Sequence, residues 1–215
     1  MAEIVPTILT SDINEFRKKI NLVSSVVPRV QIDIVDGKFA SKETIDLEGM
    51  RDLADMGNLR LDLHLMVDKP EDWVNYGLEL LPDRIIGQTE MMADPKEFIN
   101  KVVGGGIETG LALDLETKVE SIPEEYYHLV DVILILSVKA GLGGQEFDQR
   151  ALEKIGKVKK IVSDLVKIGV DGGLNDESIK LCQDKGAEIF YIGENFWRAE
   201  DLILRYNQLL RVISN

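Results

Sequence analysis

The sequence predicts a single α/β domain, a closed (β/α)8 barrel (TIM barrel) over residues 1–215. Eight short runs rich in Val, Ile and Leu alternate with segments whose apolar residues recur every three or four positions. The runs are nearly continuous, as expected for parallel strands that helices cover. Periodicity alone leaves an open, doubly wound sheet as the alternative. Eight units of regular length favour the closed barrel.

The expected elements follow one another along the chain. We expect strands near 3–9, 29–35, 59–66, 84–87, 109–113, 130–138, 166–170 and 189–192. Clear helical patterns cover 13–23, 95–103, 149–162 and 199–213. Ser11 or Asp12 can cap the first helix, and Pro95 suits the first position of the second. Gly104 and Pro123 interrupt the pattern after strands four and five.

Composition limits the function classes. The chain has 215 residues, of which 45% are apolar, and it carries 38 acidic against 25 basic residues, a formal charge of −13. A nucleic-acid binder would need a basic face. One cysteine, Cys182, excludes a disulfide framework, and no apolar run approaches the ~20 residues that span a bilayer. We expect a cytoplasmic protein without a secretory signal that binds a small molecule, and neither nucleic acid nor a membrane.

Polar residues interrupt the predicted strands where barrel enzymes carry their chemistry, at the carboxyl ends. Gln31 and Asp33 share one face of the second strand, and His64 and Met66 share one face of the third. A carboxylate inside a barrel needs a partner because its desolvation is costly. A structural salt bridge for Asp33 and a hydrogen-bonded core role for His64 are the alternatives to a functional site.

Glycine-rich turns follow strands six, seven and eight. They lie at 141–144, directly after Asp171 at 172–173, and at Gly193. Glycine permits a sharp turn and leaves bare N–H groups for an anion. Loops after strands seven and eight frequently hold a phosphate group in this fold.

These residues form a larger pattern over nearly the whole chain. The stretches that carry it are PTIL at 6–9, DIVDGKF at 33–39, DLHLMV at 62–67, GLAL at 110–113, GLGGQEF at 141–147 and VDGG at 170–173. In order and spacing the chain resembles the ribulose-phosphate 3-epimerase family, whose barrels are of the ribulose-phosphate-binding type.

The resemblance implies a two-base epimerisation that interconverts D-ribulose 5-phosphate and D-xylulose 5-phosphate in the pentose phosphate pathway. Asp33 would accept a proton and Asp171 would donate one, and both would bind a divalent metal (Mn, Mg, Zn or Fe) with His64. The substrate and its phosphate would contact Thr7, His64, Met66, Gly141, Leu142, Gly143, Gly144, Gly172, Gly173, Gly193 and Glu194. The expected partner is a sugar phosphate, and the expected assembly is a homo-oligomer.

Of the departures from the family pattern, three change the polar groups of the site; Leu136 for a methionine and Ala140 for a proline change shape and polarity little. Gln31 and Gln88 stand where the family has histidines, and glutamine is a poor ligand for Zn²⁺ or Fe²⁺ although its carbonyl can bind Mg²⁺ or Mn²⁺. Glu194 replaces a serine beside the phosphate. A carboxylate about 4 Å from a phosphate charge costs about 4 kcal/mol at an effective dielectric of 20. Arg198 or Lys139 can compensate that charge, or Glu194 can fill the anion site itself.

The sequence therefore leaves three hypotheses about the function of this chain. The first is an epimerase that acts on a small ketose phosphate. The second keeps the proton chemistry but takes an unphosphorylated or otherwise different sugar, as Glu194 suggests. The third is a non-catalytic barrel that has lost a complete metal site, as Gln31 and Gln88 suggest.

Overall fold

Eight parallel strands close into a barrel, as the sequence predicts. The computed structural model describes residues 2–50 and 58–214, and in it each strand pairs with the next while β8 pairs with β1. The strands are β1 (Glu3–Ile8), β2 (Arg29–Val35), β3 (Arg60–Met66), β4 (Arg84–Gln88), β5 (Glu108–Leu113), β6 (Val132–Leu136), β7 (Lys167–Asp171) and β8 (Ile189–Ile192). All parallel neighbours are in sequence order, which excludes the open, doubly wound sheet.

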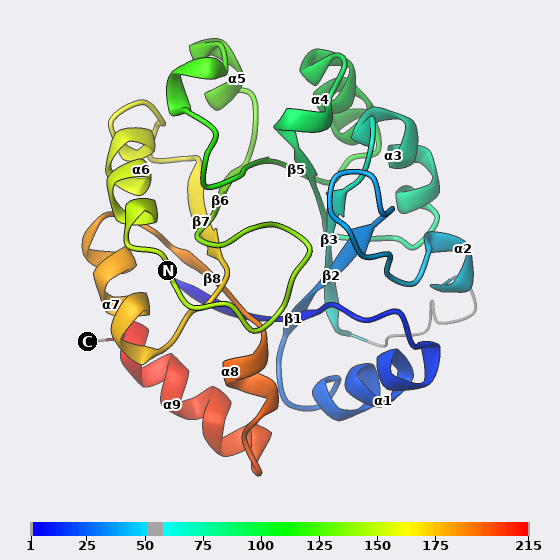
Figure 1. Ribbon diagram of the computed structural model, residues 1–215, viewed down its shortest axis with the longest axis vertical. Coiled ribbons are helices and arrows are strands. Elements are labelled where there is room, and N and C mark those ends of the chain that lie inside the picture. Colours follow the sequence, from blue (N-terminus) through cyan, green and yellow to red (C-terminus); the bar gives the residue numbers. More distant parts are fainter. Residues whose placement is uncertain (1, 51–57, 215) are drawn as a thin grey trace.

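Helices surround the barrel (Figure 1). They are α1 (Ile13–Val23), α2 (Leu47–Met50), α3 (Pro70–Leu78), α4 (Pro95–Gly104), α5 (Glu124–Tyr127), α6 (Arg150–Lys159), α7 (Asp176–Asp184), α8 (Glu194–Trp197) and α9 (Leu202–Ser214), with 3-10 turns η2 (Thr89–Met91) and η3 (Val119–Ser121). Of the two candidate caps, Asp12 caps α1, since its side chain accepts from the backbone N–H groups of Asn14 and Glu15. After β5 only the 3-10 turn and the four-residue α5 form, at the place where Pro123 interrupts the pattern.

The alternation of side chains along β2 separates two apolar shells. Ile32 and Ile34 pack outward into the cluster that contains Phe16 of α1. Met66 and Leu136 belong to a second cluster inside the barrel. Because neighbouring residues of a strand point to opposite faces, Gln31 and Asp33 must then point inward. The sequence prediction for this strand is confirmed.

An ionic cluster fills the barrel near the amino ends of the strands. Asp62 accepts hydrogen bonds from Arg29 at 3.1 Å and from Arg84 at 2.9 Å, and the hydroxyl of Tyr191 donates to it at 3.0 Å. Burial raises the pKa of Asp62, and the two arginines oppose that shift. Glu108 also pairs with Arg84. These charges satisfy one another, so the opposite end of the barrel is left for a ligand site.

The loop between β6 and α6 lies across the carboxyl end of the barrel, where it is drawn yellow-green in Figure 1. Its residues contribute to the wall of the main cavity described below. Among the described helices, none is long and apolar enough to cross a membrane.

Candidate active site

Three strands bring the predicted acids and histidine together at the carboxyl end of the barrel. Asp33 of β2 lies opposite His64 of β3 in the strand register. Asp171 ends β7, on the other side of the barrel from β3 in the strand order. One ligand atom from each of the three residues lies within 4.8 Å of the others. Residues far apart in the sequence thus meet because barrel closure brings β7 round to β2 and β3.

His64 bridges the two acids. Its Nδ1 lies 3.2 Å from Oδ1 of Asp33 and 3.9 Å from Oδ2 of Asp171. The imidazole is buried, and burial alone would lower its pKa. The hydrogen bond and charge of Asp33, with the charge of Asp171, more than offset burial and raise the pKa of His64. The two carboxyl groups therefore favour the charged form of His64 against the effect of burial.

Gln31 also joins the two acids. Its Nε2 donates to Oδ1 of Asp33 at 2.9 Å and to Oδ2 of Asp171 at 2.7 Å. An amide N–H₂ group has two donors, and both are used here. The amide oxygen, Oε1, is buried and has no hydrogen-bond partner. In this orientation Gln31 acts as a donor that holds two carboxyl groups together, a role the sequence did not predict.

The two carboxyl groups perturb each other. Burial, followed by the charge of Asp33, raises the pKa of Asp171 to about 7, and His64 and the hydrogen bond from Gln31 limit the rise. Two neighbouring carboxyl groups repel when both are ionised, so one of them tends to keep its proton. A pair of this kind can hold one proton and exchange it with a ligand.

Gln88 lies behind His64 at the end of β4. It is buried and helps to raise the pKa of His64, yet neither of its amide atoms has a partner with hydrogen-bond geometry. Gln88 does not line the cavity.

The two acids and the histidine could hold a metal ion. Two carboxylate oxygens and one imidazole nitrogen are common ligand atoms for divalent cations, and their separation is compatible with a shared ion. The unpartnered Oε1 of Gln31 adds a fourth ligand atom if its amide rotates by half a turn, because the two ends of an amide have nearly the same shape. The residues present therefore fit a hard divalent cation such as Mg²⁺ or Mn²⁺.

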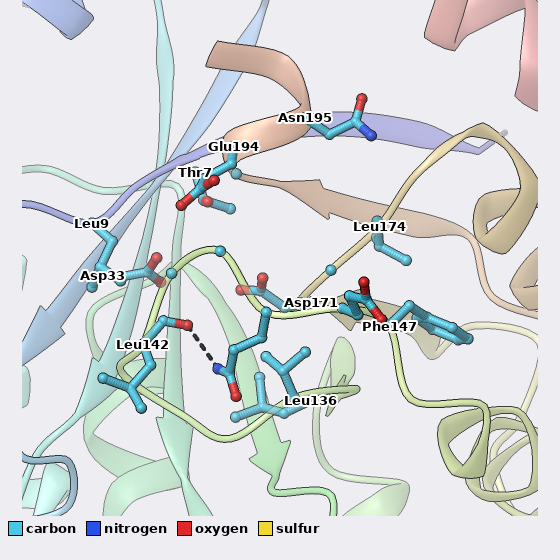
Figure 2. A pocket seen from close by; sticks show the side chains of 18 of the residues that line it. Thr7, Leu9, Asp33, Leu136, Leu142, Phe147, Asp171, Leu174, Glu194 and Asn195 are labelled. Carbon is cyan, nitrogen blue, oxygen red and sulfur yellow. Dashed lines mark hydrogen bonds between the residues drawn. The ribbon is translucent and has the colours of Figure 1, made fainter. Parts of the chain in front are cut away.

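A cavity of about 1010 Å³ opens above these groups. Figure 2 shows Asp33, Asp171 and Glu194 pointing into it. Apart from Gln31, every residue predicted for the site lines this cavity, namely Thr7, Asp33, His64, Met66, Gly141, Leu142, Gly143, Gly144, Asp171, Gly172, Gly173, Gly193 and Glu194. Gln31 lies beneath the cavity and reaches it through the two aspartates. The volume is sufficient for a small sugar.

Glycine is required in the loops that form the cavity wall. Gly173 has φ +59°, and a Cβ there would collide with the backbone nitrogen of Phe147. Gly144 has φ +76° and would place a Cβ 2.6 Å from Oε1 of Glu194. The side chain of Gln145 ties the first loop together by donating to the carbonyl oxygen of Leu142 at 2.8 Å, the dashed line in Figure 2.

Sequence reasoning missed two residues of the cavity wall, Lys19 of α1 and Trp197 of α8. Lys19 and Trp197 both line it, with Nζ of Lys19 5.2 Å from the centre of the Trp197 ring. Trp197 Nε1 donates to the carbonyl oxygen of Thr7 at 2.7 Å. Lys19 also pairs with Glu15, four residues earlier. In a sequence, such a pair indicates only a solvated helix face, and no local signal reveals the contact with Trp197.

Comparisons with known proteins show the family and the fold. The model of the family described as "Ribulose-phosphate 3 epimerase family" matches residues 3–197. The chain is 30% identical to the ribulose-phosphate 3-epimerase of Chlamydia muridarum (strain MoPn / Nigg), over 88% of this chain and 85% of that protein. It is 29% identical to the enzyme of the same name from Helicobacter pylori (strain J99 / ATCC 700824), over 98% and 97%.

Among solved structures, the orotidine 5'-phosphate decarboxylase of Pyrococcus horikoshii OT3 superposes with a TM-score of 0.67 at 13% identity, covering 99% of both chains. The thiamine phosphate pyrophosphorylase of Pyrococcus furiosus gives a TM-score of 0.64 at 16% identity, covering 99% of this chain and 95% of that one. At such low identity these similarities establish the barrel fold alone.

Proposed function

We propose that this chain, which belongs to the ribulose-phosphate 3-epimerase family, inverts the carbon next to the ketone of a small ketose by proton transfer between Asp33 and Asp171. The observation that carries this proposal is the approach of the two carboxyl groups, joined by His64 and Gln31, at the base of one cavity. The family's name makes D-ribulose 5-phosphate and D-xylulose 5-phosphate the first substrate pair to test.

In the proposed reaction, the carboxylate of Asp33 removes the proton from C3. The C3–H electron pair becomes the C2–C3 double bond, and the ketone oxygen takes up the negative charge. Asp171, in its protonated form, then returns a proton to the opposite face of C3, and the ketone forms again. The product is the epimer, with the proton now on Asp33, and the reverse reaction uses the same groups in the opposite order.

The chain's own residues would supply several parts of this reaction. A proton beside a ketone is much less acidic than a carboxylic acid, so the developing oxyanion needs strong electrostatic stabilisation. In the metal-free protein a protonated His64 can provide positive charge and Gln31 can orient both acids, whereas His64 must be neutral to bind a metal. Asp33, His64 and Asp171 would hold a divalent ion, which when bound supplies further stabilisation of the oxyanion. Met66 and Leu136 exclude water from one side of the site.

Proton exchange at C3 tests the proposal. The purified protein is incubated in D₂O with D-ribulose 5-phosphate, D-xylulose 5-phosphate and D-ribulose, with Mg²⁺, Mn²⁺, Zn²⁺ or Fe²⁺ in turn, and NMR follows the loss of the C3 proton and the appearance of the epimer. We expect both exchange and epimerisation in the wild type. Asp33→Asn and Asp171→Asn should each abolish epimerisation, because each removes the acid that serves one face of C3. No exchange with any ketose and any metal contradicts the proposal.

One observation favours a second candidate, a barrel without catalytic activity. The amide N–H₂ of Gln31 satisfies both aspartates by itself, so the pair can persist in the folded protein as a structural feature. This candidate predicts that no divalent ion binds between Asp33 and Asp171. Anomalous scattering from Mn²⁺ at that position would exclude it.

The other expectations from the family resemblance stay predictions. They are a homo-oligomeric assembly, a location in the cytoplasm and a place in the pentose phosphate pathway. Light scattering on the purified protein tests the first.

A further inference from the structure

The carboxylate of Glu194 lies against the glycine loop after β6. A Cβ on Gly144 would lie 2.6 Å from Oε1 of Glu194, and one on Gly143 would lie 3.7 Å from the same oxygen. Such short separations mean that the carboxylate rests on backbone that has no side chain to cover it. Figure 2 shows the carboxylate of Glu194 pointing into the cavity.

This part of the cavity is where barrels of this fold frequently hold a phosphate group, between the loops after strands seven and eight. Gly172 and Gly173 follow β7, and Gly193 follows β8. The carboxylate of Glu194 lies against the loop after β6 and lines the same cavity as these glycines. A second anion would lie beside it with strong mutual repulsion.

Two of the cations that line the cavity are already paired with acids. Arg198 forms an ion pair with Glu194 from one helical turn further on. Lys19 is paired with Glu15 at 2.8 Å. Among the described residues that line the cavity, and leaving His64 aside, six are acidic and three are basic, the third base being Lys139. The cavity lining thus holds more acidic than basic side chains, on a chain whose net charge is −13.

From this geometry we infer that Glu194 selects a ketose whose far end is an uncharged hydroxymethyl group and discriminates against the phosphate ester of the same sugar. The carboxylate accepts a hydrogen bond from the sugar hydroxyl. A fully ionised phosphate group has no O–H and cannot donate such a bond. This inference rests on the proposed epimerase function for the reaction itself, and it concerns the other end of the substrate. Glu194 acts here as a specificity-determining residue.

Three variants separate charge from shape. Glu194→Gln removes the charge and keeps the size, and Glu194→Ser removes both. Glu153→Gln, on the exposed surface of α6, is the control for the loss of one acid far from the cavity. For each protein the ratio of kcat/KM for D-ribulose to kcat/KM for D-ribulose 5-phosphate is measured.

We expect the unmodified protein to favour D-ribulose by about tenfold or more, because one charge–charge contact of this kind is worth at least that factor. Glu194→Gln and Glu194→Ser should shift the ratio toward the phosphate ester by a similar factor, and Glu153→Gln should not. A wild type that uses the phosphate ester as well as the free sugar, or a ratio that Glu194→Gln leaves unchanged, overturns the inference. An unchanged ratio in Glu194→Gln would mean that the Glu194–Arg198 ion pair points away from the ligand.

Binding of inorganic phosphate gives a readout that does not depend on turnover. Titration calorimetry or ³¹P NMR should show tighter binding to Glu194→Gln than to the wild type, by about tenfold. Equal binding to both overturns the inference even if the protein proves to have no epimerase activity. Conversely, if no ketose exchanges its C3 proton while Glu194→Gln gains phosphate affinity, the proposed reaction fails and the role of Glu194 stands.

Discussion

Gln31 and Asp171 are 140 residues apart in the sequence, and Nε2 of Gln31 donates to Oδ2 of Asp171 across 2.7 Å. The same nitrogen donates to Asp33 at 2.9 Å. A neutral amide thus holds together two carboxyl groups that would otherwise repel. The resemblance to the epimerase family predicted a metal ligand at this position, and the hydrogen bonds add a second possible role.

The first prediction concerns the Gln31 bridge. Replacing Gln31 by Met keeps the volume and removes both donors, so we expect the free energy of unfolding to fall by about 1–3 kcal/mol at pH 8 in EDTA. Gln88→Met is the matched control, because Gln88 is equally buried but its amide atoms have no partner with hydrogen-bond geometry. It should change stability little or increase it. Urea unfolding measures both, and equal losses for the two variants would contradict the role of the bridge.

The second prediction concerns the metal. Mn²⁺ at one hundred times its dissociation constant should stabilise the wild type by about 2.7 kcal/mol. Asp171→Asn should lose this gain, whereas Asp68→Asn, at a pair with Lys38 outside the three-residue cluster, should keep it. Gln31→His should strengthen the response, since imidazole is the better ligand for transition metals. Thermal unfolding with and without Mn²⁺ gives the answer, and a gain that survives in Asp171→Asn would place the ion elsewhere.

The third prediction is a pH dependence of stability. The pKa of Asp171 rises from its ordinary 3.8 to about 7 in the folded protein, so the folded state binds more protons than the unfolded state between these values. Because one pKa unit is worth about 1.4 kcal/mol, the stability of the metal-free protein should therefore fall by about 4 kcal/mol as pH rises from about 4 to about 7. The raised pKa of His64 extends the fall above pH 6.5.

Asp171→Asn should remove this contribution and leave the variant more stable than the wild type at pH 8 in EDTA. Glu153→Gln should retain the slope of the wild type. Denaturant unfolding at a series of pH values provides the comparison. A slope that Asp171→Asn does not reduce would show that another group is responsible.

The fourth prediction compares two glycines. Gly144 has φ +76° and faces Glu194, whereas Gly156 lies within α6 with open space where a Cβ would project. Gly144→Ala should destabilise the protein by about 1 kcal/mol or more and displace Glu194 from the loop. Gly156→Ala should stabilise it by about 0.5–1 kcal/mol. Calorimetric unfolding tests the direction of both stability changes. If Gly144→Ala left the stability unchanged, the loop would have to adopt another conformation.

Much of the fold could be predicted because each unit is local. The apolar run of β6 and the apolar positions of α6 identify their elements without reference to the rest of the chain. The predicted strand boundaries differ from the observed ones by at most two residues, since strand ends depend on pairing with neighbours. The helix expected over 199–213 is observed as α9 (Leu202–Ser214). The short α8 (Glu194–Trp197) forms a separate helical turn before it.

The candidate site was predictable in part for the same reason. The alternation of Gln31 and Asp33 with Ile32 and Ile34 identified which side chains enter the barrel, and the glycines after β6 and β7 identified the loops. The residue pairs across the cavity, such as Lys19 with Trp197, depend on how α1 and α8 lie on the closed barrel. No local pattern carries that information.

Residue type and period are local properties, and they were enough to predict the barrel and to place Asp33, His64 and Asp171 at strand ends. The resemblance to the epimerase family then implied the departures at Gln31 and Glu194. What these two departures do could be seen only in the folded chain. Closure of the strands brings Gln31 within hydrogen-bond distance of both acids, and the loop after β6 brings bare glycine backbone against the carboxylate of Glu194. Hydrogen bonding and charge repulsion act over a few ångströms, so they depend on positions that exist only once distant segments have packed together.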